Sequence, residues 1–285
     1  MAAAFKALLG TLLLLALPIP GAAQELQWVE FPALKEFDGG PVQLRAALFR
    51  PSGPGPFPAV VMLHGCSGMF ANSGDLTASY HYWGELLALS GHVALLPDSF
   101  NPRGHRSICD QQKRAILESR ERAEDAYAAR QWLASQPYVV GDRIGLMGWS
   151  NGGTGTLYAM RASQPHRGFR AAVSFYPGCR TLSRTQYTPY AQLLILSGEA
   201  DDWTPAAPCV EMVKSAKERD APADIVTYPG AHHSFDRINL PVRYRPTVRN
   251  LNKPDSLGAT VGEHPQARED AMRRTLEFFA RMLKN

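Results

Sequence analysis

Short apolar runs alternate with longer amphipathic segments along most of this chain. Continuous apolar runs at residues 59–63, 92–96 and 143–147 predict strands buried on both faces. Further short strands are expected at residues 171–175, 193–196 and 225–228, and residues 42–49 alternate as an edge strand would. Helical spacing is found at residues 77–90, 115–135, 154–162, 206–219 and 265–283. This order predicts an α/β fold with a mainly parallel central sheet and helices on both faces.

The first residues have the layout of a secretory signal peptide. Lys6 precedes a Leu- and Ala-rich run that is too short to span a bilayer comfortably, and small residues follow at Gly21-Ala22-Ala23. We expect residues 1–23 to be removed, leaving a single domain of residues 24–285 that is secreted or periplasmic and not bound to the membrane. The alternative is an uncleaved membrane anchor.

Charge and cysteine content bear on the binding partners and on the disulfides of the protein. The net charge of the chain is only +4, and its basic residues are not clustered in the sequence. Nucleic-acid binding is therefore not expected. Four cysteines in an exported chain suggest two disulfides. We favour Cys66 with Cys109 and Cys179 with Cys209, because each pair would join loops at the same edge of the predicted sheet. Free buried thiols are the alternative.

The segment Gly148-Trp149-Ser150-Asn151-Gly152 follows a predicted strand and precedes a predicted helix. Gly-x-Ser-x-Gly in this position is typical of a nucleophile elbow, in which the serine occupies a tight strand-to-helix turn. The pentapeptide alone is a weak signal, and its context makes it stronger. A serine hydroxyl needs a base to take its proton, so the rest of the chain should supply one.

An acid and a base follow later predicted strands. Asp201 and Asp202 come after the strand at 193–196, and His232 and His233 come after the strand at 225–228. Ser, then Asp, then His is the order of catalytic residues in α/β hydrolases. Ligands bind at the carboxyl ends of the strands in such sheets, which is where all of these residues fall.

The oxyanion hole is expected at the loop after the strand at 59–63. This fold takes one backbone N–H from that loop and one from the residue after the nucleophile. The candidates are therefore the N–H groups of Cys66 and Asn151. Cys66 as the nucleophile is disfavoured, because it lies in the oxyanion loop and not at the elbow.

The chain resembles the dienelactone hydrolase family of α/β hydrolases over residues 31–283. The matching segments are residues 60–65, 96–100, 148–153, 198–205 and 231–235. In that family the acid is the aspartate three residues after a glycine, and the base is the histidine just before Ser-Phe. The resemblance therefore implies Asp201 as the acid and His233 as the base.

The chain also departs from that family pattern. The best-known dienelactone hydrolases use a cysteine where this chain has Ser150, and a glutamate where it has Leu63-His64. They hold the substrate carboxylate with arginines, which implies Arg237 and, with an offset of about one residue, Arg103. A surface charge or a salt bridge is the alternative role for both arginines.

Together these features predict a secreted serine esterase or lactonase that forms an acyl-enzyme on Ser150 and acts on a small ester or lactone without a metal or cofactor. A polyester-degrading esterase is a variant of this hypothesis. A peptidase of the related superfamily and a non-catalytic binding protein on the same fold are the alternatives. The exact substrate and the oligomeric state are not readable from the sequence. Residues 239–263, which lack periodicity, are interpreted as a long loop, either a lid or a surface loop.

Overall fold

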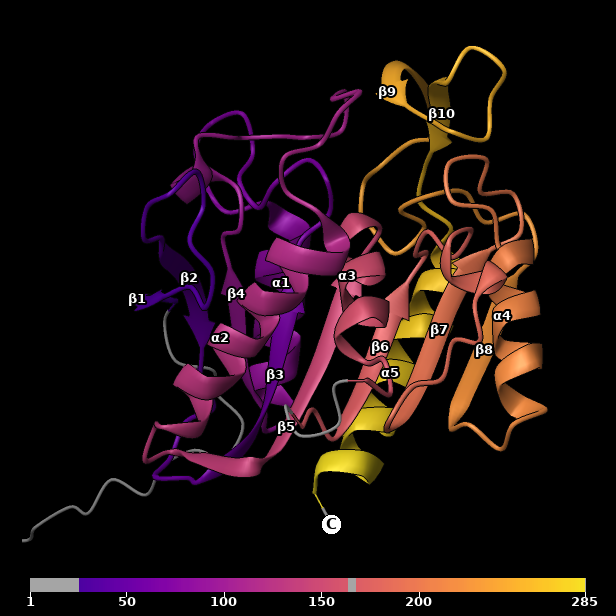
Figure 1. The fold of residues 1–285 in the computed structure, drawn as a ribbon. Helices are drawn as coiled ribbons and strands as arrows, with labels where there is room; N and C mark the ends of the chain where they lie inside the picture. Colours follow the sequence, from indigo (N-terminus) through magenta and orange to yellow (C-terminus); the bar gives the residue numbers. More distant parts are fainter. Residues whose placement is uncertain (1–25, 164–167, 285) are drawn as a thin grey trace, which may run out of the picture.

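The computed structural model describes residues 26–163 and 168–284, and its centre is an eight-stranded sheet (Figure 1). The expected signal peptide, residues 1–23, lies outside the described residues. The strands run in the order β1-β2-β4-β3-β5-β6-β7-β8. The first two pairings, β1 with β2 and β2 with β4, are antiparallel, and all the others are parallel. The mainly parallel sheet of the predicted α/β class is confirmed.

The strands of this sheet are short and mostly apolar. Their bounds are β1 Gln27–Pro32, β2 Gln43–Phe49, β3 Phe57–Leu63, β4 Val93–Pro97, β5 Val139–Trp149, β6 Ala171–Phe175, β7 Gln192–Gly198 and β8 Ala223–Tyr228. The central β4 and β6 are buried at every position. This explains why their sequences are almost entirely apolar and do not alternate with polar residues.

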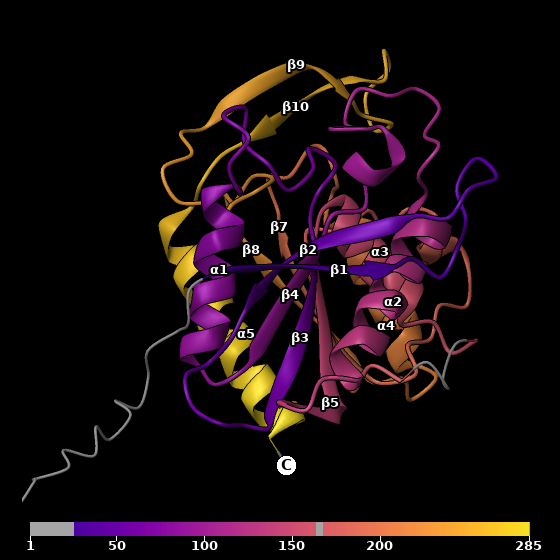
Figure 2. The ribbon, with the colours of Figure 1, turned by 90° about the vertical axis from the view of Figure 1, so that its left-hand side faces the viewer.

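Helices cover both faces of the sheet, as Figures 1 and 2 show. The helices are α1 Ala78–Leu89, α2 Ala123–Ala134, α3 Asn151–Ala159, α4 Ala207–Lys217 and α5 Pro265–Leu283, with short turns at Asn101–Arg103, Glu118–Arg122 and Leu182–Arg184. Side chains of α2, α3 and α4 pack in one apolar core. Those of α1 and α5 pack in another, so each face of the sheet has its own core.

Three expectations about individual elements need correction. The strand at residues 42–49 is not at the edge, because β1 pairs outside it. The helix expected at residues 115–135 begins with a π-helical turn, Glu118–Arg122, before α2. Residues 239–263 are not a structureless loop: they contain an antiparallel pair, β9 Arg243–Arg249 and β10 Leu257–Val261. This pair lacks apolar alternation because few of its side chains are buried.

The β9–β10 pair lies beyond the carboxyl ends of the parallel strands, at the upper end of the molecule in Figures 1 and 2. A parallel bridge joins His233 to Val261, so the base of the pair is fixed next to the segment after β8. Val248, Ala259 and Val261 are buried in a small third core. The pair therefore covers the edge of the sheet where the predicted site residues lie.

Two disulfides lie at that same edge, in the pairing that the sequence analysis favoured, although Cys209 lies in the first turn of α4 and not in a loop. They link Cys66 to Cys109 and Cys179 to Cys209.

None of the helices in the described part of the chain has the length and apolar character that a membrane span requires.

Candidate active site

Ser150 occupies the sharp turn between β5 and α3. Its backbone has a φ of +54°, which L-residues adopt only under constraint. Gly148 and Gly152 make the turn possible. A Cβ atom on Gly152 would overlap the carbonyl oxygen of Leu63, and one on Gly148 would overlap the carbonyl oxygen of Gly152. The turn presents the serine hydroxyl at the carboxyl end of the sheet, as the nucleophile-elbow motif predicts.

His233 lies between Ser150 and Asp201. Its Nε2 is 3.0 Å from Ser150 Oγ, and its Nδ1 is 2.8 Å from Asp201 Oδ2. His233 and Asp201 are buried, while Ser150 is partly exposed. A base within hydrogen-bond reach of a hydroxyl, itself oriented by a carboxylate, is the arrangement that activates serine as a nucleophile.

The loop after β7 holds the Asp201 carboxylate in place. Its Oδ1 accepts hydrogen bonds from the backbone N–H groups of Trp203 and Thr204, both at 2.9 Å. Its Oδ2 accepts a hydrogen bond from the Thr204 hydroxyl, at 2.9 Å. These donors fix the orientation of the carboxylate and leave Oδ2 facing the histidine.

The neighbouring candidates, Asp202 and His232, point elsewhere. Asp202 forms an ion pair with Lys253 at 3.0 Å and accepts a hydrogen bond from the Thr260 N–H at 2.7 Å. His232 Nδ1 lies 3.0 Å from the carbonyl oxygen of Ala200. Asp202 therefore fastens the β9–β10 pair to the loop after β7. Of the four candidates, only His233 contacts Ser150, and only Asp201 contacts the ring of His233.

Two aromatic rings enclose the imidazole of His233. The ring centroid of Tyr176 is 4.6 Å from that of His233, and the centroid of Trp203 is 4.7 Å away. Tyr176 directly follows β6, and Trp203 lies in the loop after β7. The rings leave the imidazole little room to rotate away from Ser150.

A buried carboxylate, Asp236, accepts hydrogen bonds from three rings around the site. The donors are the indole N–H groups of Trp83 at 3.1 Å and Trp149 at 2.9 Å, and the hydroxyl of Tyr176 at 2.6 Å. Burial, and then the charge of Asp236, raise the pKa of Tyr176 well above its usual value. Tyr176 therefore stays protonated and donates to Asp236.

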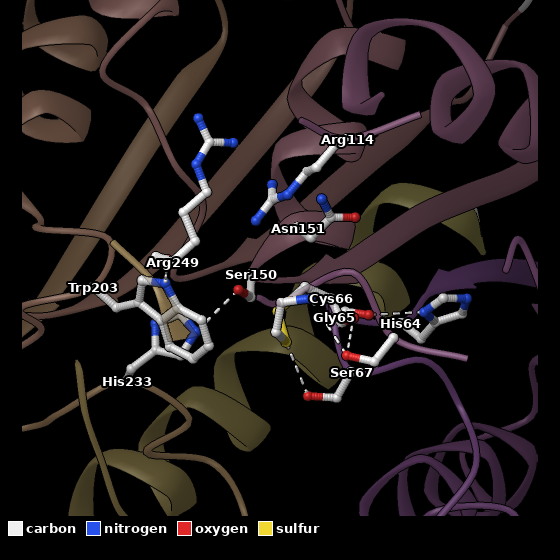
Figure 3. The surroundings of a disulfide bond; sticks show 12 residues. His64, Gly65, Cys66, Ser67, Arg114, Ser150, Asn151, Trp203, His233 and Arg249 are labelled. Carbon is white, nitrogen blue, oxygen red and sulfur yellow. Dashed lines mark hydrogen bonds between the residues drawn. A yellow bond between two sulfur atoms is a disulfide. The ribbon is translucent and has the colours of Figure 1, made fainter. Parts of the chain in front are cut away.

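The predicted oxyanion loop faces the elbow. Within the described residues, no acceptor is found for the N–H of Cys66, and the first N–H groups of a helix, such as that of Asn151, have no partner within the helix. Tyr80 fixes the loop, because its hydroxyl accepts a hydrogen bond from the Gly65 N–H at 2.8 Å. The disulfide from Cys66 to Cys109 also fixes it (Figure 3).

The fully buried His64 anchors the start of this loop. Its Nε2 accepts hydrogen bonds from Arg122 Nη1 at 3.1 Å and from the Ser99 N–H at 3.2 Å, so Nδ1 carries the proton and donates to the Gly65 carbonyl oxygen at 2.9 Å. Burial, and then the charge of Arg122, lower the pKa of His64 well below its usual value. His64 is therefore neutral, with a structural role beneath the loop.

Two clefts meet at Ser150. The first, of about 540 Å³, is lined by His233 and by Tyr176. The second, of about 480 Å³, is lined by Asn151 and lies on the other side of the serine. Both clefts share Cys66, Ser150 and Trp203.

The two arginines implied by the family resemblance differ in position. Arg237 lines the first cleft together with Arg106, Arg243 and Arg245. Burial, and then the neighbouring Arg243 and Arg237, lower the pKa of Arg245, which indicates crowded positive charge.

Arg103, in contrast, lines neither cleft, and the expectation that it binds substrate is corrected. Its side chain is fully buried and makes two hydrogen bonds of 2.8 Å to the Asp125 carboxylate, plus one to the Ser99 carbonyl oxygen. It is a structural ion pair.

Sequence reasoning missed several residues of this site. Tyr176 follows a predicted strand, so the strand-end rule that found Asp201 could have found it. Arg122 falls among the charged residues of an expected amphipathic helix, and its neighbours in the sequence do not indicate that it is buried.

Among the described residues, no group of three or more His, Cys, Asp or Glu side chains is placed to hold a metal ion.

The sheet topology, the elbow and the Ser-His-Asp geometry define an α/β-hydrolase fold. Residues 44–283 match the dienelactone hydrolase family, and the chain belongs to that family. The best-known members use cysteine at the elbow, so Ser150 marks this chain as a serine variant of the pattern.

Two related sequences and one solved structure illustrate the similarity. The chain is 28% identical over 204 residues to a probable 2-oxo-3-(5-oxofuran-2-ylidene)propanoate lactonase of a Bradyrhizobium species, covering 67% of this chain and 78% of that protein. It is 24% identical over 218 residues to a carboxymethylenebutenolidase of Rhodococcus opacus, covering 73% and 77%. The crystal structure of a dienelactone hydrolase from Anabaena variabilis is similar with a TM-score of 0.61 at 19% identity, covering 91% of this chain and 100% of that one.

Proposed function

We propose that this protein is a serine esterase or lactonase that acts on small esters or lactones through an acyl-enzyme on Ser150. The observation that carries the proposal is the continuous hydrogen-bond chain from Ser150 Oγ to His233 to Asp201. Family membership supports hydrolysis as the reaction class.

In the first half of the reaction, Ser150 Oγ attacks the carbonyl carbon while His233 Nε2 takes the hydroxyl proton. The N–H groups of Cys66 and Asn151 stabilise the negative charge that forms on the carbonyl oxygen. The intermediate then collapses, the carbon–oxygen bond to the leaving group breaks, and His233 gives its proton to the leaving oxygen. For a lactone, that oxygen remains attached to the acyl chain.

In the second half, water takes the place of the leaving group. His233 removes a proton from the water as its oxygen bonds to the acyl carbon, and the bond from that carbon to Ser150 Oγ breaks. The proton returns to the serine, and the acid is released. Asp201 stabilises the imidazolium in both halves and keeps Nε2 facing the serine.

A carboxylate on the leaving-group side of the substrate suits the first cleft. Arg237, Arg243 and Arg245 line it, and Asp236, already occupied by three donors, is the acid that lines it within the described residues. Guanidinium groups bind carboxylates through paired, charge-assisted hydrogen bonds. The name of the Bradyrhizobium relative, a lactonase of a propanoate, is consistent with an acidic lactone.

Ser150→Ala tests the proposal directly. We expect kcat for 4-nitrophenyl butyrate to fall by about three orders of magnitude or more, because no other hydroxyl replaces the nucleophile. A fluorophosphonate probe should label the wild-type protein but not the variant, which also tests the alternative of a non-catalytic binding protein. The matched control is Ser135→Ala, which removes an exposed hydroxyl at the end of α2 and should change neither measurement. Near-normal turnover by Ser150→Ala would contradict the proposal.

We also propose that the protein is exported. Its cysteines form two disulfides, and disulfides persist mainly in oxidising compartments. The amino-terminal sequence supports the same proposal through its charge, apolar run and small residues. Fractionation of cells and sequencing of the mature amino terminus test it, and a terminus near Gln24 is expected.

A further inference from the structure

The second cleft, on the Asn151 side of Ser150, combines an apolar wall with an excess of positive charge. Tyr158, Pro205, Pro208 and Leu251 contribute apolar surface. Its cationic side chains are Lys113, Arg114, Arg180 and Arg249. Among the described residues, Glu118 is the one acid that lines it. The cleft lies next to the nucleophile, so whatever binds in it is part of the reacting molecule or a direct competitor.

The negative charge of Glu118 is already engaged. Its Oε1 accepts hydrogen bonds from Arg114 Nη1 and from the side-chain amide of Asn151. Glu118 pairs with Arg114, whereas Lys113, Arg180 and Arg249 form no ion pair with it and can attract an anionic ligand. The Nε atoms of Arg114 and Arg249 and the side-chain oxygen of Asn151 are buried and have no hydrogen-bond partner in the described part of the chain.

Arg249 has a fixed backbone and a side chain directed into this cleft. Its N–H donates to the Cys109 carbonyl oxygen at 2.9 Å, and its carbonyl oxygen accepts from the indole N–H of Trp203 at 2.8 Å. In Figure 3 the guanidinium groups of Arg249 and Arg114 approach from separate segments, on the same side of Ser150 as the side chain of Asn151. Guanidinium groups bind planar anions such as carboxylates through paired, charge-assisted hydrogen bonds.

The two clefts differ in their access to His233, the residue that gives a proton to the leaving group. The leaving oxygen must receive a proton from His233, and His233 lines the first cleft but not the second. The leaving group therefore extends into the first cleft. The acyl part, which stays on Ser150 after the first half of the reaction, extends into the second.

We propose that the second cleft is an acyl-side subsite for an apolar chain or ring that ends in a carboxylate, with Arg249 as its main anchor and Arg114 beside it. This inference rests on the proposed function and names the substrate class of the same site. The preferred substrates are monoesters of dicarboxylic acids, or lactones with a second acid group on the acyl side.

The test compares two 4-nitrophenyl esters that differ only in charge. One is mono-4-nitrophenyl glutarate, which has a free carboxylate on the acyl side. The other is methyl 4-nitrophenyl glutarate, the neutral diester in which that carboxylate is methylated. For Arg249→Gln we expect KM for the charged ester to rise about 10- to 100-fold, with little change in kcat, and KM for the neutral diester to change less than twofold. Arg249→Lys should fall in between, because it keeps the charge but loses the planar fork. The matched control is Arg184→Gln, which removes an exposed arginine outside both clefts and should change neither KM.

A binding measurement separates this inference from the proposed function. The probe is glutaric acid monoanilide, an amide analogue, titrated calorimetrically into Ser150→Ala and into the Ser150→Ala, Arg249→Gln double variant. We expect the double variant to bind about 10-fold or more weakly. Equal binding, or equal changes in KM for the charged and neutral esters, would overturn the inference while an inactive Ser150→Ala leaves the proposed function standing. An active Ser150→Ala would instead overturn the proposed function.

Circular dichroism and thermal melting identify a variant that does not fold. If Arg249→Gln does not fold, the KM values of Arg249→Lys for the charged and neutral esters decide between the outcomes.

Discussion

Asp236 shows how one buried side chain can order a whole site without touching the reacting atoms. It joins Trp83 of α1, Trp149 next to Ser150, and Tyr176, whose ring packs against that of His233. Three donors to one carboxylate fix three rings at once, and charge-assisted hydrogen bonds are stronger than neutral ones. Asp236 is therefore a positioning residue for both the serine and the histidine.

Asp236→Asn should lower activity and stability together. An asparagine presents an N–H₂ group to donors, so at least one ring loses its acceptor at a cost of about 1–3 kcal/mol in the free energy of unfolding. We expect kcat for 4-nitrophenyl butyrate to fall about 10-fold or more, with KM nearly unchanged. Urea denaturation and steady-state kinetics measure the two effects. Asp142→Asn, at an exposed position, is the control, and a stability loss without any loss of kcat would contradict a positioning role.

At the scale of elements, the loop after β3 depends on contacts from distant parts of the chain. Tyr80 of α1 holds the Gly65 N–H, His64 beneath it is held by Arg122, and the disulfide from Cys66 reaches Cys109, 43 residues away. Oxyanion stabilisation requires donors that are already in position when charge develops. The Cys66–Cys109 disulfide therefore holds the proposed oxyanion loop in place as well as crosslinking the chain.

The two disulfides should differ in their effect on catalysis. Removing either one by paired Cys→Ser changes should cost about 4 kcal/mol of stability in the loop-entropy treatment, since their loops are similar in length. Only the Cys66→Ser, Cys109→Ser variant should also lower kcat for a small neutral ester, by about 10-fold or more at a temperature where both variants are folded. Equal kcat values for the two double variants would show that the loop is held without its disulfide.

At the scale of the whole molecule, charge is concentrated around the clefts. The net charge is only +4, yet arginines line both clefts at Ser150. Clefts lined by one sign of charge concentrate ligands of the opposite sign. The clefts therefore attract anions locally while the overall charge of the molecule stays small.

Salt should weaken turnover of charged esters selectively. For mono-4-nitrophenyl glutarate, we expect kcat/KM to fall severalfold as sodium chloride is raised from about 20 mM to about 500 mM, because the Debye length shortens to a few ångströms. The methyl diester serves as the control and should change less than twofold. The measurement is a kcat/KM series at constant pH, and parallel declines for both esters would argue against electrostatic attraction in the clefts.

The sequence by itself determined the order of strands and helices, the turn at Ser150, and the placement of Asp201 and His233 after their strands. These features are local, since they depend on hydrophobic periodicity and on residues a few positions apart. Only the tertiary structure decided that β1 is the edge strand, that residues 243–261 form a strand pair, and that Arg103 is buried against Asp125. It alone placed Asp236, Arg122 and Arg249, because burial and long-range pairing bring together segments whose spacing in the chain carries no signal of contact.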